Sequence, residues 1–306
     1  MKIRLIGRVL ATGTVAIGLL ASATPTSAAP IDQPSSPVTP NIVGGRDATE
    51  PYPGMISVLF DSTGAGQVYG HTCGATLRDP WHVRTNAHCV TSFPDAAAYD
   101  AGRLRVRAGS HDHASGGVVV NVTKVQVHAE WDWGTGSDRL ADVALLELSR
   151  PIWLFPFITA PASAVRDGKP ARLLGWGSTK PSGEGPLPTT LQELDTRLLP
   201  ASDCAAGGIG EGEICLAAPG GTSGACYGDS GGPALRRVAG MWLAIGSASR
   251  ETDPTCGRGP NIYTDLTYYE DWFTQVDRTG TVPPRTTPAD NTPSAATRTL
   301  RWTSAA

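Results

Sequence analysis

Short apolar runs separated by turn-forming residues dominate the hydrophobic pattern between residues 42 and 278. The runs are β-branched or alternating, and clusters of Gly, Pro, Asp and Ser bound them, which is typical of antiparallel strands in barrels or sandwiches. A late segment, 266–276, instead spaces its apolar and aromatic residues as one face of a helix does. We therefore predict an all-β protein with one C-terminal helix. The clearest strand candidates are 55–60, 104–109, 118–127, 143–148, 171–177 and 241–249.

The first residues have the pattern of an export signal. Three basic residues (Lys2, Arg4 and Arg8) precede an apolar stretch over 9–23, and small residues follow it. A membrane anchor is the alternative, but the stretch is shorter than the ~20 residues that span a bilayer. We expect residues 1–29 to be a signal peptide and the protein to be secreted and extracellular.

The composition divides the rest of the chain into a folded part and two flanks. Residues 30–41 are rich in Pro and Ser, which indicates a short propeptide. Residues 279–306 are rich in Thr, Pro and Ala without a hydrophobic period, so we expect a disordered tail. The folded domain is expected over 42–278. A formal net charge of only −3 gives no reason to expect a nucleic-acid partner or a stable membrane association.

Six cysteines are an even number in a chain predicted to be exported. An oxidising compartment makes three disulfides the default, although the sequence by itself leaves their pairing open. A zinc site built from His71, Cys73, His88 and Cys89 is the alternative. Its spacing matches no usual zinc pattern, and thiolates outside the cell tend to oxidise, so we expect no metal.

The sharpest local motif is Gly-Asp-Ser-Gly-Gly-Pro around Ser230. A serine between glycines also fits the nucleophile elbow of α/β-hydrolases, which place the catalytic histidine after the serine. The histidines of this chain, all before Ser230, are His71, His82, His88, His111, His113 and His128. The order of residues therefore excludes the α/β-hydrolase interpretation.

A base for Ser230 must come from upstream. A serine hydroxyl is a poor nucleophile until an imidazole removes its proton, and the imidazole needs a partner that fixes its tautomer. His88 lies in Thr-Asn-Ala-His-Cys, and Asp142 directly precedes a predicted strand. These two residues are the candidates for base and orienting carboxylate. We expect each of the other histidines on the surface or in a loop.

The segments around His88, Asp142 and Ser230 resemble the three catalytic segments of the trypsin/chymotrypsin family of secreted serine peptidases. The resemblance extends to Ile-Val-Gly-Gly at 42–45 and Gly-Trp-Gly at 175–177, and it covers roughly 42–278. It implies two antiparallel six-stranded β-barrels packed face to face, with a C-terminal helix. It also implies a monomeric serine endopeptidase that needs no cofactor, has protein or peptide substrates and is a target for proteinaceous protease inhibitors.

The resemblance also assigns roles to residues. Ser230 becomes the nucleophile, His88 the general base and Asp142 its orienter, with the backbone N–H groups of Gly228 and Ser230 as oxyanion hole. In the zymogen mechanism of the family, a new N-terminus at Ile42 pairs with Asp229. Asn41 precedes Ile42, so a trypsin-like activating cleavage is not expected. The implied disulfides are Cys73–Cys89, Cys204–Cys215 and Cys226–Cys256.

The resemblance further predicts an uncharged primary specificity pocket. Gly224 stands at the position of its floor, and the expected substrate-binding residues around it are Ala225, Ser247, Ser249 and Asn261. Desolvating a guanidinium without a counter-charge is unfavourable, so we predict cleavage after small or medium uncharged residues and not after Arg or Lys. An acidic residue of the neighbouring loop, Glu251 or Asp253, would change this prediction if it reached the pocket.

Two residues depart from the family pattern close to His88. Arg84 replaces a hydrophobic residue and Asn86 replaces alanine. A buried arginine is costly unless it pairs or extends to solvent. The departures keep open a catalytically weak or inactive homologue that acts as a binding protein. An esterase on the same fold is a further alternative, because acyl-transfer chemistry is shared.

Overall fold

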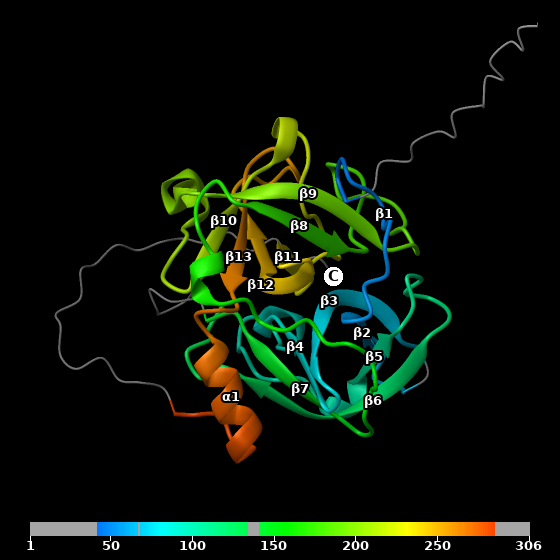
Figure 1. The fold of residues 1–306 in the computed structure, drawn as a ribbon. Helices are drawn as coiled ribbons and strands as arrows, with labels where there is room; N and C mark the ends of the chain where they lie inside the picture. Colours follow the sequence, from blue (N-terminus) through cyan, green and yellow to red (C-terminus); the bar gives the residue numbers. More distant parts are fainter. Residues whose placement is uncertain (1–41, 67, 134–140, 285–306) are drawn as a thin grey trace, which may run out of the picture. The chain divides into compact units, whose positions relative to one another are not determined.

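The computed structural model describes residues 42–66, 68–133 and 141–284 (Figure 1). The predicted signal peptide, the predicted propeptide and residues 285–306 of the predicted tail lie outside this part of the chain. The outcomes below therefore concern the predicted peptidase domain.

Six antiparallel strands form a closed barrel in the first half of the chain. In β5, Leu104, Val106 and Ala108 are buried while Arg105 and Arg107 are partly exposed, because alternate side chains of a strand point to opposite faces. The same alternation elsewhere fills the barrel with Val, Leu, Ile and Ala. The barrel order is β2 (Met55–Phe60), β3 (Gly70–Asp79), β4 (His82–Thr85), β7 (Ala144–Leu148), β6 (Val118–Val127) and β5 (Leu104–Ala108).

Six later strands form a second barrel, and the pairing of β8 with β9 closes it. The short strand β1 (Arg46–Asp47) also pairs with β9. The predicted strands in both halves are confirmed, and so are the two six-stranded barrels and the C-terminal helix. The order is β8 (Pro170–Gly175), β9 (Gln192–Leu199), β10 (Glu213–Leu216), β13 (Asn261–Asp265), β12 (Met241–Glu251) and β11 (Pro233–Val238).

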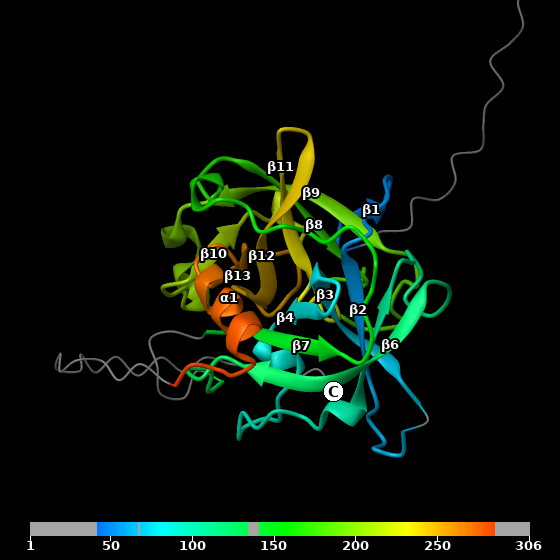
Figure 2. The ribbon, with the colours of Figure 1, turned by 60° about the horizontal axis from the view of Figure 1, so that its bottom comes forward.

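The helix α1 (Glu270–Thr279) begins later than the sequence predicts. The Asp265 side chain accepts hydrogen bonds from the backbone N–H groups of Thr267 and Tyr268, and this turn occupies the start of the predicted segment. Gly280, in the left-handed conformation, ends the helix. In Figure 2, α1 lies beside the first barrel, and its buried face joins an apolar cluster with residues of both barrels.

Three disulfides link the cysteines in the pairs that the resemblance implies, which are Cys73–Cys89, Cys204–Cys215 and Cys226–Cys256. Cys73–Cys89 joins β3 to the turn that carries His88. Cys226–Cys256 joins the segment just before Ser230 to the segment that follows β12. Among the described residues, no helix is long and apolar enough to cross a membrane.

Candidate active site

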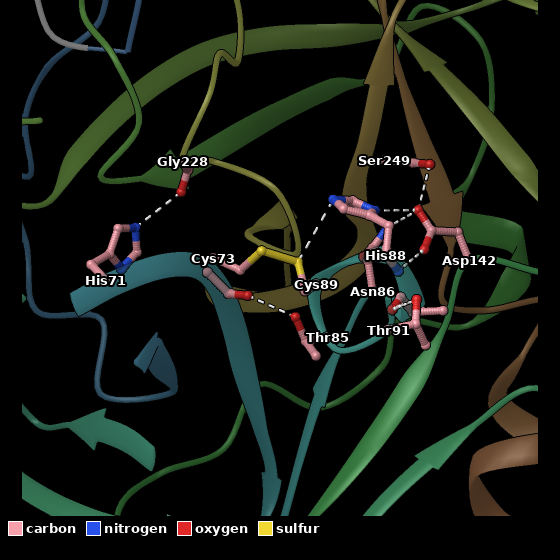
Figure 3. Close-up of a disulfide and its surroundings, with 12 residues drawn as sticks. His71, Cys73, Thr85, Asn86, His88, Cys89, Thr91, Asp142, Gly228 and Ser249 are labelled. Atoms are coloured by element: carbon pink, nitrogen blue, oxygen red, sulfur yellow. Dashed lines mark hydrogen bonds and ion pairs between the residues drawn. A yellow bond between two sulfur atoms is a disulfide. The ribbon is translucent and has the colours of Figure 1, made fainter. Parts of the chain in front are cut away.

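His88 and Asp142 are held together by the pairing of β4 with β7. Thr85, the last residue of β4, pairs with Ala144, so the residues that follow β4 meet those that precede β7. His88 Nδ1 lies 2.8 Å from Asp142 Oδ2, and the backbone N–H of His88 donates to Asp142 Oδ1 at 2.9 Å (Figure 3). A carboxylate at Nδ1 fixes the tautomer in which Nε2 accepts a proton.

Asp142 is buried and surrounded by donors. Besides His88, Asn86 Nδ2 donates to Oδ2 at 2.8 Å and Ser249 Oγ donates to it at 2.7 Å. Burial alone would raise the pKa of Asp142, but the charge of His88 and these hydrogen bonds hold it below the ordinary value. Asp142 therefore stays ionised and is fixed in orientation.

Asn86 is a site residue that the sequence analysis interpreted only as a departure. Its side chain is fully buried, and its amide reaches Asp142 from the turn between β4 and His88. The amide also lies 3.4 Å from Thr264 Oγ1 on β13 in the second barrel. The sequence did contain a signal for this role, because Asn86 lies two residues before His88. A polar side chain at that position is close to the carboxylate that orients the histidine.

Ser230 lies in the turn before β11, against the His88 region. Its backbone carbonyl accepts from Gly74 N at 2.7 Å, which ties the turn to β3. The next residue, Gly231, packs so closely that a Cβ there would lie 2.3 Å from Thr85 Oγ1 and 3.4 Å from Cys89 Sγ. Thr85 and Cys89 flank His88 in the sequence. The turn that carries Ser230 is therefore seated against the segment that carries His88.

The loop before Ser230 has the backbone shape that glycine permits. Gly228 has φ +97°, a region that residues with a side chain rarely adopt. Its carbonyl accepts a hydrogen bond from His71 Nε2 at 3.0 Å (Figure 3). Ser57 Oγ bonds to the other ring nitrogen of His71 at 2.8 Å. Burial lowers the pKa of His71 to about 3, so the ring is neutral.

The expectation that the remaining histidines lie on the surface or in loops was wrong for His71 and His82. His71 lies on β3 and holds the Gly228 loop, and His82 lies on β4 with Nδ1 2.8 Å from Asp79 Oδ2. The sequence gives no separate signal for this role of His71, because its partner is a backbone carbonyl 157 residues away.

Asp229 and Ile42 are both buried near the same loop. The Asp229 carboxylate accepts from Gly177 N at 2.7 Å and from Cys226 N at 2.9 Å. Burial raises its pKa to about 7 despite these two hydrogen bonds. Ile42 packs in the core of the second barrel, and Val43 pairs with Gly224. Among the described residues, the Asp229 carboxylate thus lacks the charged neighbour and the additional hydrogen bonds that lower the pKa of Asp142.

Ser249 borders a small cavity beside Ser230 and also contacts Asp142. A bulge in the pairing of β12 with β13 lies between Ala248 and Arg250 and turns the Ser249 hydroxyl to Asp142. The polar atom of Ser249 is therefore engaged outside this cavity. Ser247 is buried in the sheet, where it pairs with Thr264, and does not border this cavity. A bulge of this kind cannot be located from the strand pattern alone.

The cavity beside Ser230 contains an acidic side chain. Its lining includes Ala225 and Asn261, as expected, and also Glu251. The Gly224 position is crowded, because a Cβ there would lie 2.5 Å from Asn261 Oδ1. Glu251 is one of the two residues that the sequence analysis named as able to change the predicted specificity.

Arg84 pairs within the protein and does not extend to solvent. Its side chain is 1% exposed, and its guanidinium donates to the side chains of Thr76 and Thr159 and to the carbonyl of Phe157. Glu270 of α1 lies 3.8 Å away and supplies a counter-charge. This departure therefore connects the first barrel to the inter-barrel segment and the helix, away from the donors of Asp142.

The cysteines of the alternative zinc site are joined to each other as Cys73–Cys89. A disulfide offers no thiolate, so this set of residues does not fit a zinc ion.

Comparison with known proteins agrees with the fold and the arrangement of these segments. Residues 42–273 match the sequence model of the family described as Trypsin. The chain is 32% identical to trypsin alpha of Drosophila erecta over 241 residues, which are 76% of this chain and 85% of that protein. It is 31% identical to chymotrypsin-like elastase family member 1 of Homo sapiens over 255 residues, 77% of this chain and 92% of that protein. The chain belongs to the trypsin family of serine peptidases, and its homologues support a hydrolase that acts on proteins.

Proposed function

We propose that the protein is a secreted serine endopeptidase that hydrolyses peptide bonds through an acyl-enzyme on Ser230. The observation that carries the proposal is the contact of His88 with Asp142, beside the segments that seat the Ser230 turn. His88 Nε2 removes the proton of the Ser230 hydroxyl as Oγ attacks the scissile carbonyl, and then gives that proton to the leaving amine. Asp142 stabilises the imidazolium, and water repeats the sequence to release the acid.

The backbone N–H groups of Gly228 and Ser230 are the proposed donors to the oxyanion. Preorganised donors stabilise charge that develops in the transition state, typically by about 3–4 kcal/mol for each donor removed. The positive φ of Gly228 and the hydrogen bond of its carbonyl to His71 support a fixed loop at this position.

We further propose that the mature enzyme begins at Ile42 and that its ammonium group compensates Asp229. The raised pKa of Asp229, caused by burial, is the supporting observation, because an adjacent cation would return it to the ionised form.

Activity of purified variants tests the mechanism. Ser230→Ala should lower peptide hydrolysis by several orders of magnitude, whereas chelation with EDTA should leave it unchanged. The matched control is Ser202→Ala, at an exposed serine of the second half of the chain, which should retain full activity. Full hydrolysis by Ser230→Ala would overturn the mechanism. Hydrolysis of esters but not of peptides by the wild-type enzyme would favour an esterase, and no reaction with either would favour the binding homologue.

A further inference from the structure

The cavity beside Ser230 is narrow, and its lining is about equally polar and apolar. Its volume is about 20 Å³, which is room for about one water molecule. Ala225, Ala248 and the Cys226–Cys256 disulfide contribute small or apolar surface next to Ser230. A slender side chain fits such a space better than a broad one.

Two polar side chains meet in this cavity with unused hydrogen-bonding capacity. Asn261 Oδ1 accepts from Ala225 N at 3.2 Å, but its Nδ2 is buried and has no hydrogen-bond partner in the described part of the chain. A buried donor without a partner costs roughly 1–3 kcal/mol, so it is kept where something else satisfies it. Asn261 is 1% exposed and borders the same cavity as Glu251.

Glu251 borders this cavity and forms no ion pair within the described part of the chain. The neighbouring Arg250 also borders the cavity, but its guanidinium is engaged by Glu213, with Nη2 donating to Glu213 Oε2 at 2.8 Å. The charged and titratable groups that act on Glu251 are Asp229 of the Ser230 loop, Asp253 of the following loop and Tyr263 of β13. Burial, with the two aspartates adding to it, raises the pKa of Glu251 to about 8.

We propose that Glu251 sets the charge of the primary specificity pocket, which accepts uncharged side chains in either state of this carboxyl and accepts lysine side chains only when it is ionised. The inference rests on the proposed peptidase function. The sequence predicts cleavage after uncharged residues only, whereas this proposal makes the substrate preference depend on pH. The floor position, Gly224, has no side chain, so the charge comes from β12 and not from the floor.

Because the cavity holds only about one water molecule, its walls must move apart for either basic side chain, and lysine needs less room than arginine. The ammonium group of lysine is a compact charge on an unbranched chain, whereas a guanidinium is a planar fork that needs a wider slot. A bound ammonium would face the Glu251 carboxylate. When the Glu251 carboxyl is protonated, it is a hydrogen-bond donor and carries no charge. No unpaired charge is then buried in the pocket.

A pair of substrates that differ only in the ammonium group tests the proposal. Peptide amides with lysine or norleucine before the scissile bond are hydrolysed by the mature enzyme from pH 6 to 9. The ratio of kcat/KM for lysine to that for norleucine cancels the titration of the catalytic groups. We expect the ratio to rise about tenfold per pH unit and to level off near pH 8. The midpoint falls below 8 if the Ile42 ammonium compensates Asp229.

Two variants separate Glu251 from its surroundings. Glu251→Gln should keep the ratio flat from pH 6 to 9, because the amide has a similar shape and does not titrate. Asp253→Asn is the matched control, since it removes one neighbouring charge and its remaining oxygen can still accept from Thr255 N. It should retain the rise and move its midpoint to lower pH. A wild-type ratio that is constant within threefold, or an unchanged rise in Glu251→Gln, overturns the proposal.

Failure of the proposed function gives a different result. If neither substrate is hydrolysed, the peptidase proposal is wrong, and the pocket is then tested by binding alone. Calorimetry of Ser230→Ala with the same lysine peptide, in buffers of different ionisation enthalpy, should show release of close to one proton per peptide at pH 6.5. Binding without proton release, or no preference over the norleucine peptide at pH 9, contradicts the role of Glu251.

Discussion

Asp142, which is buried, and Glu251, which is partly buried and borders the cavity beside Ser230, are two carboxyl groups with different surroundings. Asp142 receives hydrogen bonds from the His88 side chain and backbone, from Asn86 and from Ser249, so its pKa lies below the ordinary value in spite of burial. Glu251 faces two aspartates, and burial raises its pKa to about 8. The comparison shows that burial alone does not decide the charge of a carboxyl group, because the neighbouring charges and hydrogen-bond donors also act on its pKa.

The pKa of Asp229 lies between those of Asp142 and Glu251. A substitution of Asp229 should have the largest effect on activity. Asp229 has two backbone donors and a pKa raised by burial to about 7. If the Ile42 ammonium completes its surroundings in the mature enzyme, Asp229→Asn should lower kcat/KM by about 10²–10³-fold, the cost typical of breaking a buried ion pair. The measurement is peptide hydrolysis, with N-terminal sequencing to show that each active form begins at Ile42. An active form that begins near residue 30 would contradict this maturation.

Two substitutions of Asn86 test how the surroundings of Asp142 control its charge. One removes a hydrogen-bond donor, and the other adds a negative charge. Asn86→Asp would place a second carboxylate against Asp142 Oδ2, which now accepts from Asn86 at 2.8 Å. We expect kcat to fall by roughly 10²-fold, as like charges at that distance cannot both stay ionised. Asn86→Ala, the control, should lower kcat less than tenfold, since His88 and Ser249 remain as donors. Equal losses in both variants would mean that Asn86 matters only for packing.

The all-β class and the C-terminal helix could be predicted from local patterns. The two barrels followed from the resemblance of ordered motifs to a known family, and that resemblance is also the source of the roles proposed for His88, Asp142 and Ser230. The Asn86 amide, the His71 contact and the position of Glu251 could not be predicted. Asn86 meets Asp142 only when β4 pairs with β7, and His71 meets the Gly228 carbonyl only when the two barrels pack. Glu251 reaches the cavity through a bulge in β12, and a one-residue shift of register has no signature in the strand pattern.

The smallest expected effect concerns stability. Below pH ~4.5 Glu251 is protonated in both the folded and the unfolded states. As pH rises from there to about 8 the unfolded chain releases this proton first, so the free energy of unfolding falls. Glu251→Gln should therefore reduce the loss of Tm between pH 5 and pH 9 by about 2–4 °C for each kcal/mol that this titration contributes, measured calorimetrically on inhibited enzyme. An identical loss of Tm in the variant would mean that the Glu251 carboxyl titrates normally.

The covalent reaction with an organophosphate tests the central claim most directly. Diisopropyl fluorophosphate reacts with a serine only where a base and an oxyanion site activate the hydroxyl. Intact mass spectrometry of the mature enzyme should show one adduct, and peptide mapping should place it on Ser230. Asp142→Asn should react far more slowly, and Ser230→Ala should not react at all. An adduct on another residue, or no adduct on a folded enzyme that still hydrolyses peptides, would contradict the account.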